Sequence, residues 1–101
     1  MTPATQRAIE RLKEQGCLAR PFLRDSQGLS CAIGVLITED LYEYELEEDD
    51  IRRDPGIQEA VVQSNPDLTF HPDTWRELAA LQSIHDTSHT LDQFLERSAL
   101  L

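Results

Sequence analysis

Apolar side chains recur at helical spacing in five stretches of this chain, and most of these stretches carry start and stop signals. In the first, Ile9 and Leu12 lie on one side of a helix, with Thr2 and Pro3 before them and Gly16 behind them. Threonine at the N-cap, proline in the first turn and glycine after the last turn are common helix bounds. We therefore predict a short amphipathic helix that ends at Gly16.

Three more helices are predicted in the second half from signals of the same kind. Asp54-Pro55 begins a stretch that ends at the turn sequence SNPD, and His71-Pro72 begins another that ends near the polar sequence HDTSH. Thr90, with Gln93 three residues later, has the spacing of a capping box before the last stretch. Each stretch carries apolar residues three and four positions apart, which is typical of one buried helix face.

The longest apolar stretch runs from Ser30 to Tyr44, and it predicts a helix in the middle of the fold with Ser30 as its N-cap. Asp40 falls on the apolar side of this helix, where an unpaired carboxylate would be too costly. Either the helix breaks at Thr38 and restarts, or Asp40 pairs with an arginine. The candidate arginines are Arg11, Arg20 and Arg24.

Residues 17–30 contain Pro21 and the polar turn sequence Asp25–Gly28, and they predict a small β-hairpin or an ordered extended loop. A chain of 101 residues has room for one domain only. We therefore expect a mainly α fold, a compact single domain over residues 1–101 with four to five short helices.

The charge excludes two classes of partner. The chain has 19 acidic and 9 basic residues and a net charge of −10, so it lacks the basic surface that binds nucleic acids or anionic membranes. No apolar stretch approaches the roughly 20 residues that span a bilayer, and the first residues lack the apolar core of a secretory signal. We expect a cytoplasmic protein whose two cysteines stay reduced.

Cys31 is the first candidate for chemistry, because the first turn of a helix can lower the pKa of a thiol. Packing is the favoured interpretation, since cysteine is among the most buried residue types and no Cys-His or Cys-x-x-Cys signature surrounds this one. Gly34 agrees with packing. A glycine inside a helix costs about 1 kcal/mol relative to alanine, and close approach of another segment is the usual compensation.

The motif Gly28-x-x-Cys31-x-x-Gly34-Val35-Leu36 is followed later by Leu81-x-x-Ile84-His85-Asp86 and an apolar helix with Phe94. In these motifs the chain resembles an uncharacterised group of small phage and bacterial proteins, which share this helix start and a late Asn-Asp or His-Asp before the last helix. A second cysteine is common where this chain has Ala32, and asparagine is usual where it has His85. The resemblance implies a mostly helical fold and a phage or prophage setting, and it implies no activity.

His85 and Asp86 form the second candidate, because His85 faces the core and a neighbouring carboxylate would make it half of an acid–base pair. Together with Cys31 they define an alternative function, a small cysteine-dependent enzyme; a small-ligand-binding protein is a further alternative. A buried histidine held by hydrogen bonds is the favoured interpretation. The spacing of His85 and His89 fits zinc only within a helix, which Thr87 opposes, so we expect no metal and no cofactor.

The run Glu39–Asp50 has eight carboxylates in twelve residues and no basic residue. Such a run is a solvated surface, or it docks on a basic patch of another protein. The function that we favour is a non-catalytic binding protein, which inhibits a nucleic-acid-binding or defence enzyme by presenting carboxylates in place of phosphates. The expected contact residues are Tyr42, Glu43, Tyr44, Glu45, Glu47, Glu48, Asp49 and Asp50. Leu100 and Leu101 would add self-association through the C-terminal helix.

Overall fold

Four α-helices and two short 3₁₀-helices make up the computed structural model, which describes residues 1–18, 23, 28–42 and 55–101. The elements are α1 (Pro3–Gln15), η1 (Gly34–Leu36), η2 (Glu39–Leu41), α2 (Pro55–Ser64), α3 (Pro72–Thr87) and α4 (Leu91–Ser98). No strand occurs in this described part. The radius of gyration is 12.2 Å, close to the roughly 13 Å of a compact domain of this length. The mainly α prediction is confirmed.

The predicted caps of α1 and α4 are confirmed, whereas Asp54, the predicted cap of α2, lies outside the described residues. The hydroxyl of Thr2 accepts a hydrogen bond from Thr5 N–H at the start of α1, and Gly16 ends this helix in the left-handed conformation at φ 85°. At the start of α4 the hydroxyl of Thr90 accepts from Gln93 N–H at 3.1 Å. The side chain of Gln93 bonds to the backbone N–H of His89 rather than that of Thr90, so the capping box is shifted by one residue.

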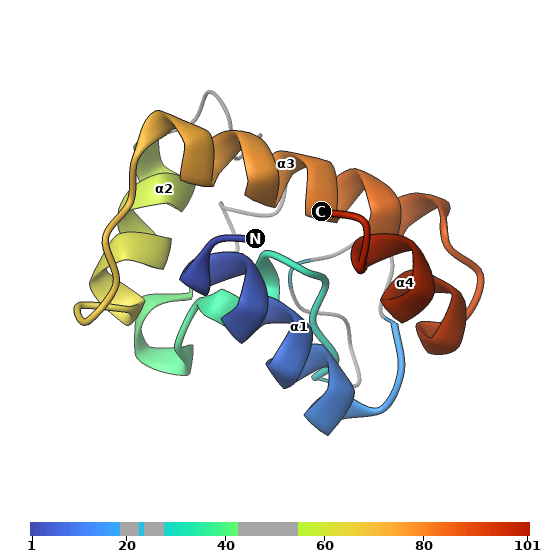
Figure 1. Cartoon of the computed structure of the whole chain (residues 1–101). Coiled ribbons are helices and arrows are strands. Elements are labelled where there is room, and N and C mark those ends of the chain that lie inside the picture. Colours follow the sequence, from blue (N-terminus) through green and yellow to red (C-terminus); the bar gives the residue numbers. More distant parts are fainter. Residues whose placement is uncertain (19–22, 24–27, 43–54) are drawn as a thin grey trace.

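α1 is the central helix, because it contacts α3, α4 and η1 (Figure 1). α3 also contacts α4, and α2 contacts η2; α2 and α4 lie at opposite ends of α3 in this view. The core between these elements consists mainly of apolar side chains, because burying apolar surface stabilises the fold. Its fully buried larger side chains include Leu12, Ile33, Leu36, Ile57, Val61, Leu78, Leu81 and Phe94.

The predicted helix from Ser30 to Tyr44 is wrong over its described part, residues 30–42. This segment holds only η1 and η2, and Thr38 between them is extended at φ −72° and ψ 156°. Ser30 is therefore not an N-cap. Of the two alternatives for Asp40, the structure shows the interruption at Thr38, although it separates two 3₁₀-helices and not two parts of an α-helix, and Asp40 is exposed on η2. The central position is also right, because most side chains from Ser30 to Ile37 are buried.

The physical reason is that other helices bind the backbone of this segment directly. Polar side chains of α1, α2 and α3, with Asn65 directly after α2, bind backbone groups of this segment, most of which a helix would pair internally. These hydrogen bonds, 2.8–3.2 Å long, join Gln15 to Ser30, Gln82 to Ile33, Arg11 to Val35, Asn65 to Leu36 and Ser64 to Thr38.

The hairpin predicted for residues 17–30 is only partly within the described chain. Cys17, Leu18, Leu23 and residues 28–30 are described, and none of them is in a strand. Leu23 is buried in the core, and Gly28 has a left-handed φ of 80°. Residues 19–22 and 24–27 lie outside the described residues.

Candidate functional site

Cys31 is a buried residue of the core. The residue is 2% exposed, and its Sγ accepts a hydrogen bond from Gly34 N–H at 3.4 Å. The helix that would have lowered its thiol pKa is not formed, since η1 has three residues and begins at Gly34. These observations agree with a packing role for Cys31.

Gly34 lies against the backbone of Leu23. A Cβ atom at position 34 would be 2.1 Å from the carbonyl oxygen of Leu23, far inside van der Waals contact. The predicted close approach of another segment to Gly34 is therefore confirmed. This contact joins Leu23 to the motif that contains Cys31 and Gly34.

His85 is completely buried near the end of α3, as predicted. Its Nδ1 lies 3.0 Å from Oδ1 of Asp86, a separation that favours the tautomer with its proton on Nδ1. Phe94 of α4 packs edge-on against the imidazole, with ring centroids 6.0 Å apart. The Asp86 side chain is 52% exposed, so this pair connects the core to the surface of α3.

Gln82 of α3 joins Asp86 to the backbone of Ile33, two residues after Cys31. Its Nε2 donates to Asp86 Oδ1 at 2.7 Å, and its Oε1 accepts from Ile33 N–H. The contacts of the Cys31 thiol and of the His85 imidazole described above run to different groups, Gly34 for one and Asp86 with Phe94 for the other.

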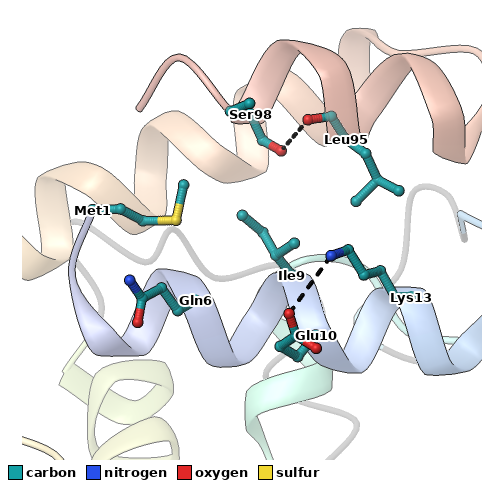
Figure 2. A pocket seen from close by; sticks show the side chains of 8 residues that line it. Met1, Gln6, Ile9, Glu10, Lys13, Leu95 and Ser98 are labelled. Atoms are coloured by element: carbon teal, nitrogen blue, oxygen red, sulfur yellow. Dashed lines mark hydrogen bonds and ion pairs between the residues drawn. The ribbon is translucent and has the colours of Figure 1, made fainter.

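A pocket of about 260 Å³ lies between α1 and α4 (Figure 2). Its lining mixes apolar and polar side chains, with the Lys13 ammonium 3.6 Å from the Glu10 carboxylate. The lining residues are Met1, Gln6, Ile9, Glu10, Lys13, Leu95, Ser98 and Ala99. Cys31, His85 and Asp86 are not among them. The volume is below the roughly 300–1,000 Å³ of most ligand sites.

The histidines do not converge. His85 is buried, whereas His71 precedes α3 and His89 precedes α4 at exposed positions. Among the described residues, no three histidine, cysteine, aspartate or glutamate side chains form a group that would hold a metal ion.

The acidic run begins at the surface. Glu39 and Asp40 are exposed on η2, and Tyr42 is half-buried against the core. Most of the predicted contact residues lie outside the described chain. These residues are Glu43, Tyr44, Glu45, Glu47, Glu48, Asp49 and Asp50.

All five basic side chains in the described ranges are engaged within the molecule. Arg7 binds the carboxylate of Asp67 with both terminal nitrogens, at 2.9 and 2.6 Å. Arg11 donates to a backbone carbonyl, and Arg97 donates to side-chain and carbonyl oxygens at the end of α3. The remaining pairs are Lys13 with Glu10 and Arg76 with Asp73.

Two carboxyl groups have lowered pKa values. The hydrogen bonds from Arg7 lower the pKa of Asp67 to about 2, and the positive charge of this guanidinium adds to the effect. Burial raises the pKa of Glu77, but hydrogen bonds from Thr5 and from the backbone N–H of Thr2 outweigh it, so that pKa lies below its ordinary value. Both groups join α1 or its N-terminus to other parts of the fold.

Leu100 and Leu101 differ in exposure. Leu100 is 90% exposed, while Leu101 packs partly against the core, and self-association through this end stays a prediction. None of the described helices is both long enough and apolar enough to cross a membrane. No protein-family model, curated protein or solved structure matches this chain.

Proposed function

We propose that this protein is a small acidic binding protein without catalytic activity, which binds a basic surface of a host or viral protein in the cytoplasm of a phage-carrying bacterium. The observation that carries the proposal is the exposure of Glu39 and Asp40 on η2, directly before six more carboxylates at positions 43–50. Concentrated charge of one sign speeds the encounter with a basic patch and selects partners of opposite charge.

The distribution of basic residues supports a role in binding. The described arginines and the described lysine already have partners within the molecule, and Asp40 has a carboxylate that is exposed to solvent. A basic patch on a partner would supply the opposite charge. Such patches are typical of proteins that neutralise phosphates of nucleic acids.

The environments of Cys31 and His85 support a non-catalytic role. A nucleophile or a general base must reach its substrate. Both side chains are buried, and neither lines the pocket between α1 and α4.

We therefore infer that the target is a nucleic-acid-binding enzyme and that the carboxylates of the run take places otherwise taken by phosphates. Capture from a bacterial lysate tests this, with the immobilised protein at low and at high salt and with duplex DNA as competitor. We expect a captured protein that both salt and DNA release, because each weakens contacts between the run and a basic patch.

Matched variants locate the binding surface. One variant carries glutamine in place of Glu45, Glu47 and Glu48. The control carries glutamine in place of Glu14, Glu59 and Glu96, which are exposed on α1, α2 and α4. Both sets of substitutions change the net charge by the same amount. We expect the first variant to lose the captured protein and the control to keep it. Equal capture by the two variants would contradict the proposal.

A further inference from the structure

One side chain draws together the backbone at the two cysteines of this chain. Nε2 of Gln15 donates to the carbonyl oxygen of Cys17 at 2.8 Å and to that of Ser30 at 2.9 Å. Two oxygens bound to one nitrogen at such distances lie within about 6 Å of each other. Oε1 of the same amide accepts from Ser30 N–H at 2.8 Å. Gln15 therefore holds the residue directly before Cys31 beside Cys17.

We propose that Cys17 and Cys31 form an intramolecular disulfide when the protein meets a peroxide, and that this bond is a redox switch for the segment 28–42. A disulfide needs Cα atoms about 4.4–6.8 Å apart, and the Gln15 amide holds the carbonyl oxygen of Cys17 close to that of Ser30, the residue before Cys31. Both residues are free thiols, Cys17 exposed and Cys31 buried. Reversible disulfides of this kind are found in reducing compartments.

The exposure of Cys17 makes it the residue that reacts first. Its sulfur attacks one peroxide oxygen, the O–O bond breaks, and the products are a sulfenic acid at Cys17 and one water. The Cys31 sulfur then attacks the sulfur of this sulfenic acid, the S–O bond breaks, and the hydroxyl leaves as water with the thiol proton. Two thiols lose two electrons and two protons, and one hydrogen peroxide is reduced to two waters.

The bond would change the backbone near η1. The Cys31 sulfur now accepts the hydrogen bond from Gly34 N–H, so a bond from this atom to Cys17 acts on a direct contact of η1. Gly34 is the first residue of η1 and packs directly on the Leu23 backbone. Oxidation therefore acts on the segment that leads to the exposed carboxylates of η2.

Mass spectrometry of the whole protein treated with hydrogen peroxide tests the proposal. We expect a mass lower by two hydrogens, protection of both thiols from alkylation after unfolding, and a proteolytic fragment that links Cys17 to Cys31. Dithiothreitol should reverse all three changes. A dimer linked through Cys17, or an oxidised Cys17 beside a Cys31 that is still alkylated after unfolding, would overturn the proposal.

Variants of α1 test the role of the glutamine. Gln15→Ala is expected to slow disulfide formation several-fold, because it removes the contacts that align the two backbones. Gln6→Ala is the control, an exposed glutamine on the same helix, and should keep the wild-type rate. Equal rates for the two variants would show that Gln15 does not align the cysteines. Cys17→Ser should leave Cys31 reduced.

Discussion

Gly34 of the apolar motif packs directly against the backbone of Leu23. At Gly34, a Cβ atom would lie within 2.9 Å of three backbone atoms of Leu23, and a backbone atom cannot rotate away as a side chain can. The presence of a glycine in an apolar sequence indicated such an approach. Its partner was not predictable, since no repeat or spacing relates Leu23 to Gly34.

Gly34→Ala is expected to destabilise the protein by about 1–3 kcal/mol, because the backbone at one of the two positions must move to admit the methyl group. Urea unfolding measures the change. Gly56→Ala is the matched control at an exposed position in the first turn of α2, where we expect no loss and a gain of up to about 1 kcal/mol. Equal midpoints for the two variants would contradict the contact described for Gly34.

Among the elements, α3 and α4 are joined by the side chain of Arg97, which donates hydrogen bonds to groups at the C-terminal end of α3. Arg97 of α4 donates to the hydroxyls of Ser88 and Thr87 at 2.8 and 3.0 Å, and more weakly to the carbonyl of Ile84. The last carbonyls of a helix have no internal partner and carry partial negative charge. The guanidinium of Arg97 supplies both a donor and a positive charge there.

Arg97→Ala should lower the free energy of unfolding by about 1 kcal/mol, the usual contribution of a helix-end interaction of this kind. The control is Arg76→Ala, which removes an arginine that pairs only with Asp73 on the same helix at an exposed position. An exposed pair of this type contributes about 0–0.5 kcal/mol. Chemical denaturation of both variants gives the comparison, and a smaller loss for Arg97→Ala than for Arg76→Ala would refute the capping role.

The helices were predictable because their signals are local. Thr2, Gly16 and Thr90 act within three or four residues of their own positions, so the sequence around them contains the information. Residues 30–42 were mispredicted for the opposite reason. Their apolar spacing matches a helix, but their backbone partners Gln15, Asn65 and Gln82 are far away in the chain. The burial of Cys31 and His85 was predictable from their apolar surroundings, and the contacts of these side chains were not.

At the scale of the whole molecule, the sequence establishes the net charge of −10, while the structure shows which of the described charges are paired. Arg7 of α1 reaches Asp67 and also the buried amide of Asn65, at 3.1 Å. The amide in turn donates to the carbonyls of Leu36 and Val61. One arginine therefore ties α1 to the end of α2 and, through it, to η1.

This ion pair predicts a dependence of stability on pH. The pKa of Asp67 is about 2, below the ordinary value of roughly 3.9. A lowered carboxyl pKa contributes stability that is present above the ordinary value and is lost as pH falls toward 2. We expect the difference in unfolding free energy between wild type and Asp67→Asn to be present at pH 7 and to disappear across this interval.

Urea unfolding from neutral pH down to pH about 2 measures this difference. Comparing the two proteins at each pH removes the contribution of the other carboxylates, which both share. In an Arg7→Gln background, the effect of Asp67→Asn should be much smaller, because the main partner is gone and only a backbone hydrogen bond and the charge of Arg11 still favour the carboxylate. A pH-independent difference, or an unchanged effect without Arg7, would exclude the ion pair as its source.

The side-chain contacts that hold residues 30–42 also set an order of events during synthesis. This segment leaves the ribosome before Asn65 and Gln82 leave it, so of the partners described above only Gln15 and Arg11 of α1 are then able to bind it. The amide and carbonyl groups destined for α3 and for the turn after α2 stay hydrated until those parts emerge. The backbone contacts of residues 30–42 are thus completed only when Gln82 of α3 has emerged.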